Sequence, residues 1–412
     1  MQPPGMRYIS TRGMAPRVDF EGALFSGYAP DGGLFMPEEL PQLSTETLRQ
    51  WSTLSYPGLV KELCTLFIGP ELIPRDVLNG LIDQAFSRFR HREVVRLSRL
   101  RNGLNVLELW HGVTYAFKDL SLCCTAQFLQ YFLEKKERHV TVVVGTSGDT
   151  GSAAIESVQG AKNMDIIVLL PKGHCTKIQE LQMTTVLREN VHVFGAGCIA
   201  QKMGLPIRLV VAVNRNDIIH RTVQQGDFSL SEAVEQTLAS AMDIQVPYNM
   251  ERIFWLLSGS NSQVTRALME QFERTQSMSL PKELHSKLSG AVTSESVSDE
   301  AITQTMARCW EENKYLLCPH SAVAVSYHYQ QTEQQPPSLP RCCLAPASAA
   351  KFPEAVLAAG LTPETPAEIL ALESKGTRCT PMRKGDDWTL MLRNTIEDIS
   401  CQQRDHFLNA LE

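Results

Sequence analysis

The chain has 412 residues, of which 43% are hydrophobic and 20% are charged, as in a globular protein with room for two or more packed domains. Its net charge of −6 and its pI near 6.0 give little support to a nucleic-acid-binding or polybasic membrane-binding role. The eleven cysteines lack zinc-type spacing, so neither a metal site nor a disulfide framework is predicted.

The sequence also indicates a cellular compartment. The first residues contain no apolar stretch of the signal-peptide type, and no stretch of the chain is long enough to span a bilayer. An odd number of cysteines fits a reducing environment. These features predict a cytoplasmic protein, and export by an unconventional route stays open.

Residues 1–100 are predicted to form an α-rich N-terminal unit. The turn-rich sequence that begins at Ala29 precedes three amphipathic helices, which are expected at residues 44–54, 56–67 and 75–85. Most of this unit is interpreted as a packing scaffold.

Lys118 is the residue on which the prediction of an active site depends. It follows an apolar run that ends at Phe117, and it stands at the start of a helix expected at residues 119–136 with Asp119 as the N-cap. A cation there opposes the helix dipole and lies beside aromatic side chains. Both effects lower the pKa of an amine, as a Schiff-base lysine requires. The alternative is a lysine that reaches from the helix start to water.

A glycine-rich turn follows a buried strand that is predicted at residues 140–144. The sequence GTSGDTGSAA, which starts at Gly145, leads from this strand into a helix, and free backbone N–H groups at such a helix start bind anions. Ser147 and Thr150 add hydroxyl groups and Asp149 adds an acceptor. These side chains favour a ligand loop over the alternative, in which the glycines only allow tight packing.

The rest of the chain alternates between strands and helices. Strands are expected at residues 165–170, 191–194 and 207–213, and helices at residues 177–187, 198–203, 229–241, 249–257 and 262–275. This alternation predicts an α/β fold with a doubly wound, mainly parallel sheet and ligands at the carboxyl ends of its strands.

A polar, proline-containing connector at residues 330–340 marks a change of organisation. Beyond it we expect a strand at residues 342–344 and a helix at residues 347–359. The predicted units are therefore residues 1–100, 101–330 and 331–412.

Several segments together resemble the threonine synthase family, whose members are pyridoxal-phosphate enzymes of fold type II. They keep the family's order and begin at Tyr8, Ala29, Glu108, Gly145, Leu170 and Pro319. The resemblance extends over nearly the whole chain and is greatest to the animal threonine-synthase-like branch. It implies α/β lobes behind the N-terminal unit, pyridoxal phosphate as cofactor, a small phosphorylated amino acid as substrate and, since the family is often dimeric, a homodimer.

The resemblance also implies residues that hold the cofactor. Lys118 takes the position of the lysine whose amine binds it. The glycine-rich turn resembles the loop that holds the substrate carboxylate and the oxygen on C3 of the cofactor ring, namely Ser147, Gly148, Asp149, Thr150 and Gly151.

Further residues are implied to bind the substrate. His111 and Thr114 are assigned to substrate positioning, and Thr176 and Lys177 to the substrate phosphate. Arg12 or Lys172 is expected to add positive charge. For the three cations Lys177, Arg12 and Lys172, a position on the solvated surface is an equal alternative.

The activity implied is that of a catabolic phospho-lyase. It would convert O-phosphohomoserine and O-phosphothreonine to 2-oxobutanoate, ammonia and phosphate, with the cofactor as electron sink and Lys118 as the general base for the α-proton. No residue distinguishes this outcome from threonine synthase activity, which is the alternative.

The sequence departs from the family after the strand predicted at residues 191–194. The family has several dozen further residues there, including a central strand and a glycine-rich turn that binds the cofactor phosphate. Here Phe194 runs through Gly195–Gly197 into the next helix, and these glycines are expected to be a flexible joint more often than a replacement phosphate site. This predicts an isoform without a central strand, and it leaves open an impaired chain with a binding or signalling role.

A second departure concerns the pyridine nitrogen of the cofactor. Pro346 stands where the family has a residue whose hydroxyl group hydrogen-bonds this nitrogen. Electron withdrawal by the ring is therefore expected either to be weaker or to rely on Ser348.

Overall fold

The structure is a computed structural model that describes residues 5–146, 148–161, 163–170, 175–185, 207–334, 340–377, 379–383 and 385–409. The strand predicted at residues 191–194, the helix predicted at residues 198–203 and Gly195–Gly197 lie outside these ranges, and so do Ser147 and Lys172.

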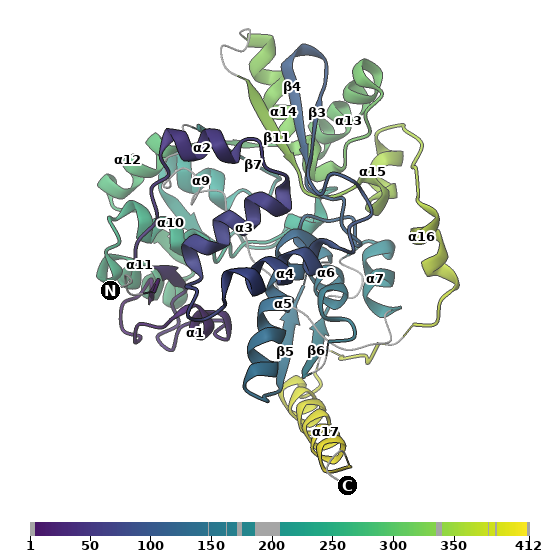
Figure 1. The fold of residues 1–412 in the computed structure, drawn as a ribbon. Coiled ribbons are helices and arrows are strands. Elements are labelled where there is room, and N and C mark those ends of the chain that lie inside the picture. Colours follow the sequence, from purple (N-terminus) through teal and green to yellow (C-terminus); the bar gives the residue numbers. More distant parts are fainter. Residues whose placement is uncertain are drawn as a thin grey trace.

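The described part of the chain alternates between helices and strands (Figure 1). The α-helices are α1 (Phe20–Leu24), α2 (Thr45–Trp51), α3 (Tyr56–Phe67), α4 (Arg75–Phe86), α5 (Lys118–Lys135), α6 (Asp149–Val158), α7 (Lys177–Thr184), α9 (Ile218–Gln225), α10 (Met250–Leu257), α11 (Ser262–Thr275), α12 (Lys282–Ala291), α13 (Asp299–Asn313), α14 (Pro319–Gln334), α15 (Pro353–Ala358), α16 (Ala367–Leu370) and α17 (Trp388–Asn409). Short 3-10 helices are η1 (Arg101–Gly103), η2 (Ser240–Met242), η3 (Ala349–Lys351) and η4 (Ala371–Ser374).

The strands form small sheets. They are β1 (Tyr8–Ser10), β2 (Phe35–Pro37), β3 (Arg96–Arg99), β4 (Leu104–Glu108), β5 (Val140–Gly145), β6 (Met164–Leu169), β7 (Leu209–Val213), β8 (Asp227–Ser229), β9 (Ser277–Ser279), β10 (Val292–Ser296) and β11 (Arg341–Ala345). β5 pairs with β6, β10 with β7 and β11 with β4 in parallel, whereas β1–β2, β3–β4 and β8–β9 are antiparallel. Parallel strands joined through helices confirm the α/β class.

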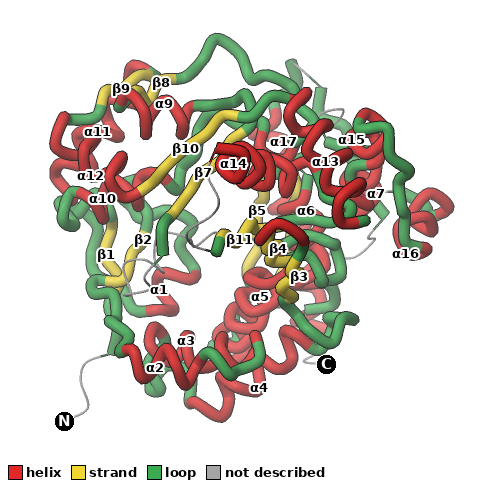
Figure 2. The backbone as a smooth tube through the Cα atoms, turned by 90° about the horizontal axis from the view of Figure 1, so that it is seen from above, coloured by secondary structure: helices red, strands yellow, loops and turns green. Residues whose placement is uncertain are grey.

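Each parallel pair has its own apolar core. Helices α5 and α6 pack on β5–β6, α13 and α14 pack beside β4 and β11, and α9 to α12 form a third cluster with β10. Figure 2 shows β10 and β7 side by side with α14 next to them. Helix α17 projects away from the other elements, and no helix in the described residues combines the length and apolarity needed to cross a membrane (Figure 1).

Helix α5 is apolar on two sides, and this fixes its position. Leu122 and Leu129 face the β5–β6 core, whereas Phe128 and Phe132 pack against α3 and α4. A helix buried on both sides has little freedom to shift, so its first residue, Lys118, has a defined place.

The C-terminal part of the chain returns to the start of α5. Ala116 and Ala347 form an isolated antiparallel bridge. Beside it the Phe117 N–H donates to the Pro346 carbonyl at 2.7 Å, and the Ser348 N–H donates to the Tyr115 carbonyl at 3.0 Å. These bonds bring η3, with Lys351, next to Lys118.

Two predicted helices are wrong. Where a helix was predicted at residues 229–241, the chain leaves β8, continues without regular structure and ends in η2. Side chains bond to the backbone groups that a helix would need: Asp243 accepts from the Thr237 N–H, and Asn216 donates to the Glu235 carbonyl. The helix predicted at residues 347–359 is divided into η3 and α15, because Pro353 forces the residue before it out of the helical conformation.

Candidate active site

Lys118 is the first residue of α5 and keeps an unpaired amine. Its Nζ lies 4.5 Å from the centre of the Phe117 ring, and it makes no hydrogen bond or ion pair with any residue that the structure describes. Burial lowers the pKa of this amine; the charge of Asp149 acts against this effect and that of Lys351 adds to it. A larger fraction of Lys118 is therefore neutral than of a surface lysine, as nucleophilic chemistry requires.

Asp149 and Lys351 form a buried ion pair beside it. Lys351 is 0% exposed, and its Nζ lies 2.7 Å from Oδ1 of Asp149. Gln179 Nε2 donates to the same oxygen at 2.9 Å. Burial tends to raise the pKa of Asp149, but the charges of Lys351 and Lys118 and two hydrogen bonds outweigh it and lower the pKa to about 2. The carboxylate is thus ionised at neutral pH.

The glycine-rich turn presents the first turn of α6 to this cluster. Thr146 Oγ1 accepts from the N–H groups of Gly148 and Gly151, at 3.0 and 2.9 Å. Gly148 has φ +135°, and a Cβ there would lie 2.6 Å from the Gln179 side chain. Conformation and close approach both require glycine at this position. Thr150 lies in the first turn of α6.

Thr114 joins the cluster through its backbone. Its N–H and hydroxyl donate to the Asp119 carboxylate at 2.8 and 2.7 Å, and its carbonyl accepts from Lys351 Nζ at 2.9 Å. Asp119 is therefore not the N-cap of α5, as the sequence predicted: Phe117 is the N-cap, and Asp119 turns back to hold the preceding loop. Burial raises the pKa of Asp119 to about 6.

His111 belongs to a different network. Its Nε2 lies 2.7 Å from Oε2 of Glu108, whose other oxygen accepts from Tyr315, and its ring stacks on His91. Burial tends to raise the pKa of Glu108, but hydrogen bonds from His111, Ser98 and Tyr315 lower it. No contact in the described residues joins His111 to Lys118, so its role in substrate positioning stays a prediction.

Thr176 and Lys177 begin helix α7. Thr176 is the N-cap in a capping box with Gln179, and its hydroxyl donates to the Lys351 carbonyl at 2.9 Å. Lys177, the next residue, is exposed. Thr176 therefore connects to the cluster through Lys351, whereas Lys177 lies at the solvent side of a helix N-terminus.

Arg12 is fully engaged elsewhere. It donates from Nε and Nη2 to the Glu251 carboxylate, both at 3.1 Å, and from Nη2 to Glu273 at 2.6 Å. Arg12 and Glu251 are both buried. The expectation that Arg12 supplies charge to a substrate phosphate is wrong, because two carboxylates already neutralise it.

Two residues near Lys118 were not predicted as site residues. Lys351 is one; the other is His320, whose Nε2 accepts from the Ala241 N–H at 3.1 Å and whose ring centre lies 4.7 Å from that of Phe352. Its Nδ1 is buried without a partner in the described part of the chain. Burial lowers the pKa of His320 to about 4, so the ring is neutral at pH 7.

A sequence signal for both residues existed. His320 follows Pro319 in one of the segments that carry the family resemblance, and Lys351 interrupts an apolar run between Ala350 and Phe352. Neither signal states which partner the side chain meets.

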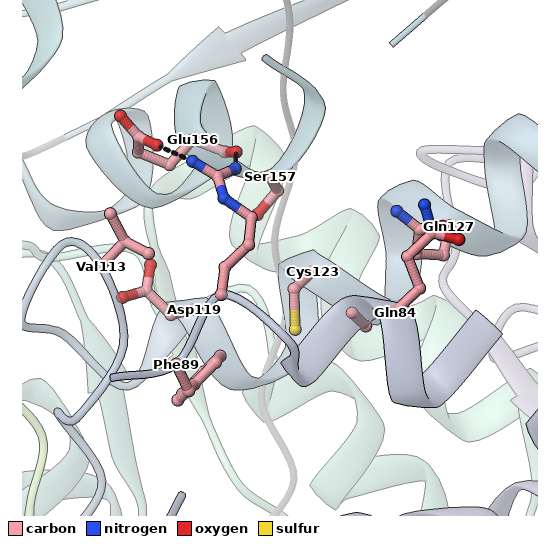
Figure 3. A pocket seen from close by; sticks show the side chains of 10 residues that line it. Gln84, Phe89, Val113, Asp119, Cys123, Gln127, Glu156 and Ser157 are labelled. Atoms are coloured by element: carbon pink, nitrogen blue, oxygen red, sulfur yellow. Dashed lines mark hydrogen bonds and ion pairs between the residues drawn. The ribbon is translucent and has the colours of Figure 1, made fainter. Parts of the chain in front are cut away.

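Cavities adjoin the cluster on the side of Asp119 and Thr114. The one in Figure 3 has a volume of about 40 Å³, and Asp119 and Val113 line it beside the Arg88–Glu156 ion pair. A larger one of about 340 Å³ is lined by Thr114, Tyr115 and Gln182. Lys118 lines neither cavity.

Two family models match parts of the chain. The family models "Threonine synthase N terminus" and "Threonine synthase, C-terminal" match residues 7–86 and 321–391. The chain is 32% identical to threonine synthase of Schizosaccharomyces pombe, with 85% of the chain and 88% of that protein covered. It therefore belongs to the threonine synthase family.

Within the family it is similar to proteins called Threonine synthase-like 2. The human protein of that name is 73% identical, with 98% of this chain and 100% of the human chain covered. The alignment runs over 482 positions, whereas this chain has 412 residues, so at least 70 positions have no counterpart here.

Solved structures share the fold. Pyridoxal-phosphate-bound threonine synthase from Brucella melitensis is 30% identical with a TM-score of 0.84, over 92% of this chain and 96% of that one. Yeast threonine synthase is 29% identical with a TM-score of 0.87, over 96% and 99%. The predicted fold type II is thereby confirmed.

Proposed function

We propose that this chain binds pyridoxal phosphate through Lys118 and acts as a carbon–oxygen lyase on phosphorylated amino acids. The substrates would be water and either O-phosphohomoserine or O-phosphothreonine, and the products 2-oxobutanoate, ammonia and phosphate. The observation that carries this proposal is the unpaired amine of Lys118, whose pKa is lowered by burial. Membership of a family with a pyridoxal-phosphate-bound member supports it.

The residues around Lys118 fit the reactive end of such a cofactor. An amine without an ionic partner lies within the electrostatic influence of the Asp149 carboxylate, and Nδ1 of His320 is buried without a hydrogen-bond partner in the described residues. The bound cofactor supplies an electron sink. Lys118 Nζ would take the substrate α-proton, since a neutral amine can act as a general base and burial favours the neutral form.

The turn at Gly148 and the first residues of α7 are candidates for the anionic groups of the substrate. Gly148 is the N-cap of α6 and Asp149 to Gly151 begin its first turn, and Thr176 caps α7 beside Lys177. Helix N-termini favour carboxylate and phosphate. The Ser348 hydroxyl accepts from the Ala350 N–H but donates to no residue that the structure describes, so it is the candidate for the pyridine nitrogen.

A second candidate function is that of a shortened product without catalysis, which acts by binding or signalling. The longer alignment with the human relative favours it, and so do apolar side chains left uncovered on the parallel strands. Val143, Val210 and Leu344 are 38%, 42% and 54% exposed. Parallel sheets are normally covered on both faces, so these strands lack part of their usual cover.

One experiment separates the candidates. Purified protein is incubated with pyridoxal phosphate, the absorbance of the bound cofactor is followed, and phosphate, 2-oxobutanoate and threonine are measured after O-phosphohomoserine is added. We expect cofactor binding and 2-oxobutanoate, both lost in Lys118→Ala and both retained in Lys287→Ala, a control at an exposed helix position.

The other outcomes of this experiment also distinguish between a lyase, a synthase and a non-catalytic product. Threonine in place of 2-oxobutanoate would make the chain a synthase. No cofactor uptake would overturn the proposal and favour the non-catalytic product, whereas activity equal to that of the longer relative would exclude that second candidate.

A further inference from the structure

Two ammonium groups, those of Lys118 and Lys351, compete for one buried carboxylate. Asp149 interacts electrostatically with both, but only Lys351 forms the ion pair, at 2.7 Å. No residue in the described part of the chain takes the place of Asp149 as a partner of Lys118. The outcome of this competition determines whether the Lys118 amine is free.

The structure fixes Lys351 at both ends. Its Nζ donates to the Thr114 carbonyl as well as to Asp149, and its own carbonyl accepts from the Thr176 hydroxyl. Ser348 caps the 3-10 turn that carries it. Lys351 therefore joins the loop before α5, the start of α6 and the cap of α7, and its ammonium group cannot leave Asp149 without also losing or straining its bond to the Thr114 carbonyl.

We propose that Lys351 is a positioning residue that holds the Asp149 carboxylate away from Lys118 and so leaves the Lys118 amine free to react. The inference deepens the proposed function and rests on it only in taking Lys118 as the reactive amine. Lys351 acts through Asp149 and need not touch cofactor or substrate.

The other titratable groups near the pair do not replace it. Burial keeps His320 neutral, with a pKa of about 4, and burial raises the pKa of the Cys318 thiol, so neither carries charge at neutral pH. Asp119, whose pKa burial raises to about 6, is held by Thr114. The balance at Lys118 is therefore set by Asp149 and Lys351.

The test measures the protonation of Lys118 in the full chain without cofactor. Acetic anhydride labels neutral amines, and peptide mass spectrometry of samples labelled over a pH series gives the midpoint for Lys118. Lys351→Met releases Asp149 to pair with Lys118, so the midpoint should rise by about one pH unit, a tenfold loss of neutral amine. Asp149→Asn should lower it, and the double variant should return it towards the wild-type value.

If Lys351 had only a structural role, the labelling midpoint of Lys118 would not move in opposite directions in the two single variants and return towards the wild-type value in the double variant. The double variant removes both charges of the Asp149–Lys351 ion pair, so with Asp149→Asn it carries the test if Lys351→Met does not fold. Midpoints that stay unchanged, or that move in the same direction in all variants, would overturn the inference. Cofactor uptake by the wild-type chain is measured separately, and its absence would count against the proposed function alone.

Discussion

Two buried clusters of charged groups in this molecule are balanced in opposite ways. Around Arg12 one cation meets two carboxylates, those of Glu251 and Glu273, and Thr11 donates a further hydrogen bond to Glu251 at 2.6 Å. Around Lys118 two cations meet one carboxylate, and one amine is left over.

The difference separates a structural cluster from a functional one. Buried charges are stable when they are paired, and removing one partner is costly because the other stays buried and unpaired. The Arg12 cluster obeys this rule and ties the N-terminal unit to α10 and α11. The Lys118 cluster leaves one group unsatisfied, which is typical of sites where reactivity is needed.

The largest effect on stability is expected at the structural cluster. Arg12→Met removes the cation that pairs with the buried Glu251 carboxylate and leaves it the hydrogen bond from Thr11, so the free energy of unfolding should fall by about 3–5 kcal/mol. Urea unfolding measures this. The control Arg49→Met removes an exposed ion pair and should cost at most about 1 kcal/mol. Equal losses in the two variants would show that the Arg12 cluster is not structural.

The next effect is a loss of stability at acidic pH, which depends on His320 beside the Lys118 cluster. The pKa of His320 is about 4 in the folded chain and near 6.5 when unfolded, so the unfolded state binds the extra proton first as the pH falls. Stability is therefore lost between pH 6.5 and pH 4, by up to about 3 kcal/mol. Subtracting the curve for His320→Gln from that of the wild type isolates this contribution from those of the carboxylates. A difference that does not change with pH would contradict the assignment.

A smaller effect is expected when the unpaired amine itself is removed. Lys118→Met deletes a charge that has no ionic partner in the described residues and keeps the apolar stem, so the free energy of unfolding should change by less than about 1 kcal/mol. Cofactor uptake should nevertheless be abolished. A loss of stability as large as that of Arg12→Met would mean that Lys118 is as structural as Arg12.

The sequence predicted those parts of the fold that depend on local pattern. Helix α5 was expected at residues 119–136 and is Lys118–Lys135, because its apolar positions recur with helical spacing. The helix expected at residues 229–241 did not form, because Asn216 and Asp243, which both lie outside that segment, bond to its backbone groups. Bonds to side chains outside a segment leave no trace in its periodicity.

The candidate site shows the same limit. Lys118 and Asp149 could be predicted because each lies at a helix start with its own local signal. Lys351 could not be predicted, because its role depends on its ion pair with Asp149. Asp149 lies about 200 residues earlier in the chain and contacts Lys351 only in the folded protein. The capping role of Asp119 was misread for the same reason, since its partner Thr114 is set by the loop.

The smallest effect on stability is expected at Lys177, and it tests whether charge outside both clusters serves the substrate. Lys177 is exposed at the start of α7, so Lys177→Met should change the free energy of unfolding by at most about 0.5 kcal/mol. If it contacts the substrate phosphate, KM for O-phosphohomoserine should rise about fivefold, as a loss of roughly 1 kcal/mol implies, while kcat changes little. Lys287→Met, at another exposed helix position, should leave KM unchanged. An equal KM in all three proteins would exclude Lys177 from the site and leave the phosphate to the backbone N–H groups at the helix start.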